Sequence, residues 1–337
     1  MGNKIIGLDL GTSIVRIWTK EKGIILRQPT VISLNKNTSG VEKVGFEAKK
    51  LIGKTGGEFS NTETFNPISG GVIVGFDETV KMLYSFFKQV GLNSVFSRPS
   101  VVVGISDLAT PVDYGSVFNA LFAAGAKSGG IAFVKQPVAA AIGLGIPVDI
   151  PRGSMIVDIG GGTTQVAVFC YDRIVSSRAI DTGSRKFDEA IIHYMRKHHN
   201  IQIGMNAAEA TKIKIGSVIP TYNQKDHIIM GFNTVRKRPD KITVNSNVIA
   251  EAISEHSKAI LNLIKGVLME LPPEICSDIY TNGIILTGGG SLIYGMANML
   301  SSNLGVNIKI SSTPQDDVIK GIGRIITEKL DQYMEFY

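Results

Sequence analysis

Two short segments of the chain combine an aspartate, a glycine turn and hydroxyl side chains between β-rich runs. The first is Asp9-Leu10-Gly11-Thr12-Ser13 and the second is Asp158-Ile159-Gly160-Gly161-Gly162-Thr163. Successive backbone N–H groups and hydroxyls in such turns form a concave site for phosphate. The aspartate before each turn adds a carboxylate, and Mg²⁺ takes a few carboxylates, retained waters and phosphates as ligands. The two segments therefore indicate a Mg–nucleotide site.

A third glycine run, Thr287-Gly288-Gly289-Gly290-Ser291, ends an apolar strand and precedes the amphipathic stretch 292–300. Backbone without side chains lets an adenine or ribose lie close to the start of a helix. One glycine turn alone is a weak signal, because ordinary turns also need glycine. Glycine makes up 37 of 337 residues, about 11% against a usual ~7%. We infer that the excess marks places where a ligand approaches the backbone.

Strands are predicted on both sides of each aspartate turn, and helices are predicted in the segments that follow the second turn. Each aspartate turn lies between two β-branched runs, which is typical of a β-hairpin. Strand alternation then puts Ile14 and Arg16 on one face of the second strand and Val15 on the other. Residues 30–64 are strand-like and loop-rich, residues 187–199 and 206–216 have helical spacing, and 247–271 predicts one amphipathic helix that Pro272 ends.

Composition excludes several classes of protein. The chain has 35 Lys and Arg against 29 Asp and Glu, a formal charge of +6, with 44% hydrophobic residues, so it is not predicted to be disordered. No apolar run reaches the ~20 residues that span a bilayer. The two cysteines lie far apart, which fits a reducing compartment, and the five histidines have no metal-ligand spacing. No nucleic-acid recognition pattern accompanies the positive charge.

The three glycine segments together resemble the phosphate and adenosine motifs of the actin-like ATPases, and within them the MreB family of bacterial actins. The resemblance extends over essentially the whole chain, in the collinear segments 44–49, 51–55, 137–143, 208–216, 272–278 and 314–323. It implies an α/β actin-like fold, with two ribonuclease-H-like domains around a nucleotide cleft. The implied subdomains are IA (1–31, 75–136 and 316–337), IB (32–74), IIA (137–178 and 251–315) and IIB (179–250).

The resemblance also implies the ligands, ATP or ADP with Mg. Asp9 and Asp158 would bind Mg through water, and the turns and the third glycine run would bind the nucleotide. Glu209 and Lys212 form either a surface i,i+3 pair or, by resemblance, a border of the adenosine. The implied nucleotide-binding residues are Gly11, Thr12, Ser13, Ile14, Arg16, Gly160, Gly161, Gly162, Thr163, Gly183, Glu209, Lys212, Gly288, Gly289, Gly290 and Ser291.

Several positions depart from the family pattern. Members of the family carry a glutamate before the proline of the segment 135–141, where it activates the attacking water, whereas this chain has Gln136. An amide can orient a water but cannot accept its proton. Gln165 also stands where a glutamate is usual. The implied ATPase, with Gln136 and Thr163 as catalytic residues, is therefore expected to be slow. Arg16 is either a phosphate-contacting cation or a solvated basic residue.

Partners are implied by the resemblance and by charge. The family implies homopolymer filaments, including paired antiparallel ones, and contact with other shape or cytoskeletal proteins, in the cytoplasm at the inner face of the cell membrane. Positive charge fits an anionic membrane surface. Val95 and Phe96 either contact the membrane or complete the core, and the helically spaced tail 322–337 packs on its own domain or contacts the membrane. The alternative functions are a nucleotide-binding pseudo-ATPase partner of filament proteins and a small-molecule kinase.

Overall fold

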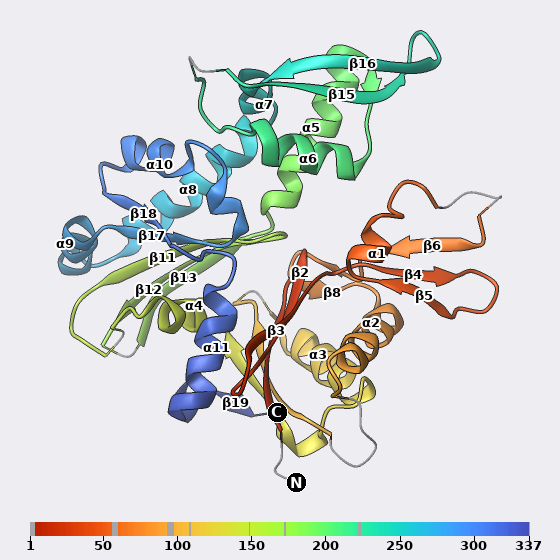
Figure 1. The fold of residues 1–337 in the computed structure, drawn as a ribbon. Helices are drawn as coiled ribbons and strands as arrows, with labels where there is room; N and C mark the ends of the chain where they lie inside the picture. Colours follow the sequence, from red (N-terminus) through yellow and green to blue (C-terminus); the bar gives the residue numbers. More distant parts are fainter. Residues whose placement is uncertain are drawn as a thin grey trace. The chain divides into compact units, whose positions relative to one another are not determined.

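A computed structural model describes residues 4–55, 60–92, 98–107, 109–147, 149–171, 173–221 and 224–336. Val95 and Phe96 lie outside these residues, so their predicted roles stay predictions. The chain forms two compact units (Figure 1). Unit 1 contains Met1–Ile150, Tyr171–Arg173 and Gln315–Tyr337, and unit 2 contains Pro151–Cys170 and Ile174–Pro314.

Unit 1 is built on a six-stranded mixed sheet with the order β19-β10-β9-β1-β2-β3. The first three strands of the chain form an antiparallel meander, and β1 then pairs in parallel with β9. The predicted first hairpin is thus confirmed. The strands are β1 (Ile5–Leu10), β2 (Ile14–Thr19), β3 (Gly23–Pro29), β9 (Ser100–Ile105), β10 (Ile131–Lys135) and β19 (Glu335–Phe336).

Helices cover both faces of this sheet. Alternate residues of its strands pack either on α2 (Phe76–Gln89) and α3 (Pro111–Ala123) or on α4 (Gln136–Leu144) and α11 (Asp317–Glu328). Thr110 caps α3 in a reciprocal capping box and Pro111 follows at its first turn, which fixes where that helix begins. Helix α4 belongs to unit 1, and the four implied subdomains stay a prediction.

The remaining part of unit 1 is small. The three-stranded sheet β5-β4-β6 falls in the strand-like segment predicted over 30–64, apart from the last residue of β6, and the two-stranded sheet β7-β8 follows it. Their elements are β4 (Ile32–Asn35), β5 (Val41–Val44), α1 (Phe46–Lys49), β6 (Thr62–Phe65), β7 (Ile68–Ser69) and β8 (Val72–Ile73), and the short helix η1 (Ser128–Gly130) precedes β10.

The C-terminal segment is only partly helical. Ile322 and Ile325 of α11 are buried in the core that this helix shares with α4, so the predicted packing on its own domain is confirmed for the helix. The predicted continuation of the helix to residue 337 is wrong. Lys329 takes a left-handed conformation and the N–H of Leu330 donates to the Ile325 oxygen, a geometry that ends helices. The short helix η3 (Asp331–Tyr333) and strand β19 follow.

Unit 2 repeats the sheet plan of unit 1, with the order β13-β12-β11-β17-β18. An antiparallel meander again leads into parallel strands, and one large apolar core joins the sheet to its helices. The elements are β11 (Ser154–Ile159), β12 (Thr164–Cys170), β13 (Arg173–Ile180), α8 (Ser254–Glu270), α9 (Pro273–Asn282), β17 (Ile284–Thr287), η2 (Gly289–Leu292), α10 (Met296–Leu304) and β18 (Ile308–Ile310).

A smaller sheet, β14-β15-β16, lies over helices α5, α6 and α7 of the same unit (Figure 1). The two helices predicted at 187–199 and 206–216 are α5 and α6. The single helix predicted over 247–271 is interrupted at Ile253, which is buried with non-helical backbone between α7 and α8. The elements are α5 (Ser184–His199), β14 (Ile201–Gln202), α6 (Met205–Ile215), β15 (Asp226–Asn233), β16 (Arg238–Asn245) and α7 (Ser246–Ala252).

Candidate functional site

The turn between β1 and β2 is held by hydrogen bonds from two other segments. The hydroxyl of Thr30 donates to the Gly11 oxygen at 2.7 Å, and the Thr30 N–H donates to the Ser13 oxygen at 3.0 Å. The N–H of Gly71 donates to the Thr12 hydroxyl at 3.0 Å. These contacts fix the shape of the turn before any ligand binds, which is the pre-organisation that a phosphate-binding loop needs.

An ion cluster, buried at Asp9 and exposed at Arg27, lies beside this turn. Arg16 pairs with Asp9 across the hairpin, and its Nη1 lies 2.9 Å from Asp9 Oδ2. Its Nε lies 3.3 Å from Asp316 Oδ1, and Arg27 binds Asp316 with contacts of 2.8 and 3.1 Å. The Arg16 side chain is only 11% exposed, so the solvated alternative for this residue is wrong. Phosphate contact by Arg16 stays a prediction.

The pKa values of the two carboxylates in this cluster, Asp9 and Asp316, are shifted in opposite directions. Burial raises the pKa of Asp9, although the charge of Arg16 and a hydrogen bond from Gln136 oppose this. For Asp316 burial also acts to raise the pKa, but Arg27 and Arg16 outweigh it and hold the value below the ordinary one. The difference follows from the number of cations: Asp316 has two arginines, and Asp9 is buried with one.

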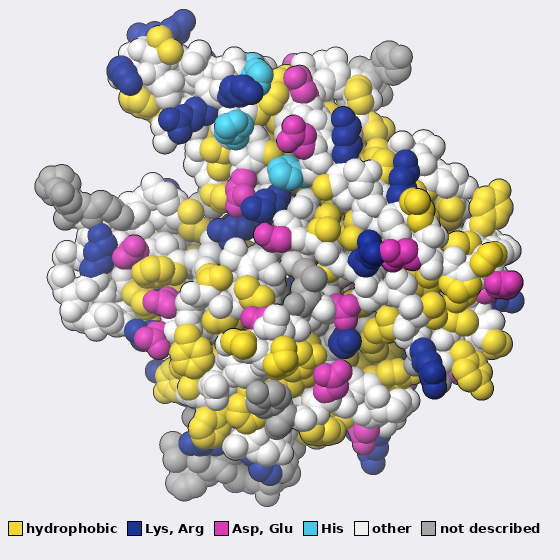
Figure 2. All heavy atoms as spheres, turned by 180° about the vertical axis from the view of Figure 1, so that it is seen from behind, with side chains coloured by type: hydrophobic (Ala, Val, Ile, Leu, Met, Phe, Trp, Pro, Cys, Tyr) yellow, Lys and Arg dark blue, Asp and Glu magenta, His cyan; other side chains and the backbone are white. Residues whose placement is uncertain are grey.

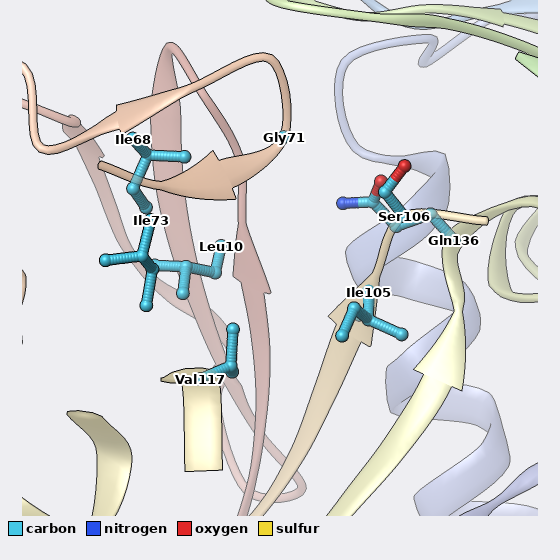
Figure 3. A pocket seen from close by; sticks show the side chains of 9 residues that line it. Leu10, Ile68, Gly71, Ile73, Ile105, Ser106, Val117 and Gln136 are labelled. Atoms are coloured by element: carbon cyan, nitrogen blue, oxygen red, sulfur yellow. The ribbon is translucent and has the colours of Figure 1, made fainter. Parts of the chain in front are cut away.

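Gln136 occupies the start of α4 and lies close to Asp9, to which its side chain hydrogen-bonds. Gln136 also lines a small pocket with Gly104 and Ser106, opposite the apolar side chains of Leu10, Ile68, Ile73 and Val117 (Figure 3). The neighbouring Lys135 binds Asp107 at 3.2 Å and so has a carboxylate partner of its own. The arrangement gives Gln136 a fixed position beside a polar pocket wall.

The turn between β11 and β12 repeats the first one with different side chains. Asp158 lies opposite Gln165 in this hairpin, as Asp9 lies opposite Arg16 in the first. Both Asp158 and Gln165 are buried. A glutamate at position 165 would place two carboxylates face to face, whereas the neutral amide avoids that repulsion.

Helix α5 begins directly against this second turn. The N–H groups of Ser184 and Arg185 donate to the oxygens of Gly160 and Gly161, both at 2.9 Å. A Cβ on Gly183 would lie 2.6 Å from the backbone of Gly161, so only glycine allows this close approach. The structure therefore brings Gly183 to the turn that contains Thr163.

The third glycine segment packs on the same hairpin. Gly288 has φ of +79°, and a Cβ there would lie 2.2 Å from Asp158 Oδ1. Gly290 similarly packs on Ile159, and the Ser291 hydroxyl donates to the Gly288 oxygen at 2.7 Å. Gly289 and Gly290 lie at the start of the short helix η2. Two of the three predicted segments are thus in direct contact within unit 2.

Lys212 does not behave as a surface residue. Its Nζ lies 2.8 Å from Asp188 Oδ2 and donates to the Ser184 oxygen at 2.7 Å, which connects α6 to the first turns of α5. The Lys212 and Asp188 side chains are only 11% and 7% exposed. Glu209 lies one turn earlier on α6 and is half-buried. Contact of either residue with an adenosine remains a prediction.

Sequence reasoning missed Asp316, Arg27 and Asp188. The first two reach the site through pairings of about 290 and 300 residues in sequence separation, for which no local pattern exists. The Asp9–Arg16 pairing could have been predicted from the sequence, because Arg16 and Gln165 each follow the aspartate of their hairpin by seven residues. In the described part of the chain no three His, Cys, Asp or Glu side chains gather as a metal site. A metal here would therefore need oxygens from water or from phosphate.

Comparison with known proteins identifies the family. The profile of the MreB/Mbl protein family matches residues 3–334. The chain belongs to the MreB/Mbl family. This MreB/Mbl chain is 37% identical over 327 residues to the cell shape-determining protein Mbl of Bacillus subtilis (strain 168), covering 97% of this chain and 96% of that protein. It is also 37% identical over 334 residues to the cell shape-determining protein MreB of Escherichia coli (strain K12), covering 97% and 94%.

Solved structures confirm the actin-like α/β fold of this MreB/Mbl chain. The crystal structure of MreB5 of Spiroplasma citri bound to ADP superimposes with a TM-score of 0.91 and 28% identity, covering 98% of both chains. A second structure of that protein, bound to AMPPNP, gives the same score and identity. The MamK double helical filament shares the fold at a TM-score of 0.79 and 18% identity. None of the helices in the described ranges has the length and apolarity needed to cross a membrane.

Proposed function

We propose that this MreB/Mbl chain binds ATP and ADP with Mg, and assembles with copies of itself into filaments at the inner face of the cell membrane that govern cell shape. Family membership supports the assembly and the cellular role, since the relatives at 37% identity carry the name cell shape-determining protein. The ADP-bound and AMPPNP-bound structures of Spiroplasma citri MreB5 support the ligand. We also propose that the implied subdomains IB (32–74) and IIB (179–250) are parts of units 1 and 2, since their ranges fall within those units.

The observation that carries the ligand proposal is the repeated hairpin. In both units an aspartate is the last residue but one of the first strand, a glycine turn follows, and the residue opposite the aspartate is buried or nearly so. The turns offer backbone N–H groups to phosphates. In unit 2 the Gly288–Ser291 segment packs on the Asp158 turn, which fits an adenosine held next to the phosphates.

Each unit offers one buried carboxylate that suits a magnesium ion held through water. Asp9 and Asp158 are the carboxylates that would hold its waters, and Arg16 occupies only one oxygen of Asp9. Bound Mg²⁺ would neutralise charge on the phosphate oxygens. Arg16 would then pair with Asp9 or turn to a phosphate, and Asp316 and Arg27 would limit how far its guanidinium moves.

We expect slow ATP hydrolysis because of the side chain that would face the attacking water, Gln136. Gln136 is positioned by Asp9 and by the start of α4, so it can orient a water. It cannot take the proton of that water, a contribution typically worth ~10²–10⁴-fold in rate. Phosphoryl transfer depends largely on positioning and charge, so slow turnover is expected to remain. The same residue supports the second candidate, a nucleotide-binding protein without hydrolysis.

Assembly in the presence of nucleotide tests this proposal. We expect electron microscopy of the purified protein with Mg-ATP to show filaments, and Asp158→Ala to prevent them at the same ATP concentration because Mg-nucleotide binding is weakened. The matched control is Asp278→Ala, which removes a carboxylate of unit 2 that binds the Gly153 N–H away from the glycine turns. Filaments of Asp158→Ala that match the wild type, with unchanged ATP affinity, would contradict the site assignment.

A further inference from the structure

The outer face of the β14-β15-β16 sheet exposes a row of large apolar side chains. Ile228, Met230 and Phe232 of β15 are 55%, 67% and 42% exposed, whereas Ile229 between them is buried in the core of unit 2. Alternate residues of a strand are about 6.8 Å apart, so the three side chains form a row roughly 14 Å long. The other face of the sheet packs on helices, and among the described residues of unit 2 this face has no partner.

Basic side chains border the row. Thr243, Lys241 and Pro239 of β16 lie directly opposite Ile228, Met230 and Phe232. The turn beyond the row contributes the exposed Val235, Arg236 and Lys237. The other exposed cations of the border are Lys225 before β15 and Arg238 and Lys241 of β16, while the exposed Asp226 lies two residues before Ile228.

The charge of this hairpin is out of proportion to its length. Residues 224–245 contain five Lys and Arg against Asp226 and Asp240, a net +3 that equals half of the +6 of the whole chain. Asp240 is engaged by Arg236 and by the N–H of Lys241. Lys237 and Lys241 make no ion pair within the described part of the chain, so their charges face solvent. Figure 2 shows dark-blue side chains with yellow ones between them on the projecting end at the upper left.

We propose that this surface, Ile228, Met230 and Phe232 with its basic border, binds the surface of an anionic phospholipid bilayer. The three apolar side chains would enter the region below the headgroups, and the lysines and arginines would contact lipid phosphates. This proposal goes beyond the proposed function, which assigns the membrane contact to no surface, and it differs from the contacts predicted from the sequence at Val95 and Phe96 or at the tail 322–337. The hairpin is a second lipid-binding surface, in the other unit of the chain.

Two features favour a bilayer over an acidic protein as the occupant. Three of the five bordering cations are lysines, and lysine is depleted in protein–protein interfaces relative to the rest of the surface. Long lysine and arginine stems let apolar neighbours enter the acyl boundary while the charges stay at the headgroups. A short apolar row with a dense basic border is the pattern of proteins that lie on anionic membranes.

Vesicle sedimentation without added nucleotide tests the surface separately from assembly. The full chain is mixed with vesicles of phosphatidylglycerol and phosphatidylcholine, or of phosphatidylcholine alone. We expect binding only to the first, weakened at least tenfold by Ile228→Ser/Met230→Ser/Phe232→Ser. Lys237→Glu/Lys241→Glu should also weaken it, by about fivefold or more for each charge. The matched control is Met269→Ser/Tyr280→Ser, which changes side chains that are 86% and 69% exposed elsewhere in unit 2.

A fluorescent side chain in the row gives a direct reading. Met230→Trp should shift its emission to the blue with anionic vesicles only, and the shift should persist when Val95→Ser/Phe96→Ser is added. Persistence separates this surface from the membrane contact predicted at Val95 and Phe96. Unchanged sedimentation of the triple variant, equal loss in the control variant, or loss of the tryptophan shift together with Val95 and Phe96 would overturn the proposal.

Two further results would also overturn it. If the triple variant keeps vesicle binding but loses filament assembly, the face is a contact between copies of this chain. If phosphatidylcholine vesicles bind as well as anionic ones and an acidic protein competes with them, the basic border recognises a protein. Circular dichroism of the Ile228/Met230/Phe232, Lys237/Lys241 and Met269/Tyr280 variants should match the wild type, because the side chains substituted in them are exposed.

Discussion

Helices α4 and α11 approach so closely that Gly321→Ala should destabilise unit 1. A Cβ on Gly321 would lie 1.7 Å from the Ala139 oxygen and 2.9 Å from the Gly143 nitrogen. Ordinary contacts begin at 3.4 Å, so the two backbones would have to separate by about 1.7 Å. The core between these helices contains Ile322 and Ile325, which are fully buried and would lose contacts. We expect a loss of about 3 kcal/mol in the free energy of unfolding, at the upper end for overpacking.

The displacement should also reach the candidate site. Gln136 starts α4, and Asp316 immediately precedes α11, so separating the helices moves both groups relative to Arg16. Urea unfolding followed by tryptophan fluorescence is the direct assay, because Trp18 is the single tryptophan and packs on Gly323 of α11. ATP affinity should fall in the same variant at temperatures where it remains folded.

Gly266→Ala is the matched control. Gly266 lies inside helix α8, and the atom nearest to a Cβ there is Arg178 Nη1 at 3.6 Å, an ordinary contact. Replacing glycine by alanine in a helix interior should stabilise by about 0.5–1 kcal/mol. A Gly321→Ala protein that unfolds at the same urea concentration as the wild type would refute the reasoning about the helix crossing.

Three further predictions concern single side chains. Gln136→Glu should raise phosphate release several-fold or more at similar ATP affinity, by supplying a proton acceptor; an unchanged rate would point to another water-activating group. Asp316→Asn should cost about 1 kcal/mol at pH 7 by leaving Arg16 with one carboxylate. Because the folded pKa of Asp316 is lowered, this stability should vanish as pH falls through that pKa, and acid unfolding curves of variant and wild type should then converge. Burial and Glu335 raise the pKa of Tyr114 to about 12, so stability should be lost as pH rises from 10 to 12, and absorbance titration should show a late phenol that is lost in Tyr114→Phe.

The hairpins were predictable because their signals are local. Asp9, Asp158 and the glycines after them combine a turn requirement with β-branched flanks, and both hairpins form as expected. The alternation that put Arg16 on the face opposite to Val15 also holds, since Val15 is buried and Arg16 faces the ion cluster.

The partners of those hairpins were not predictable. Asp316 meets Arg16 across 300 residues, and its position depends on how α11 packs against α4. The end of α11 at Lys329 was missed because the apolar spacing continues beyond it, whereas the strand β19 pairs with β10 through backbone groups that leave no pattern in the sequence. The nucleotide role of Glu209 and Lys212 rests on resemblance, and the buried Lys212–Asp188 pair shows that packing competes with that role.

A structure of the protein crystallised with AMPPNP and magnesium tests the central claim most directly, that the glycine segments of both units bind one nucleotide. We predict that the phosphates contact the N–H groups of the turns at 11–13 and 160–163, with the adenosine against Gly288–Ser291 and the metal's waters on Asp9 and Asp158. A nucleotide bound elsewhere, or in contact with only one of the two turns, would contradict the account.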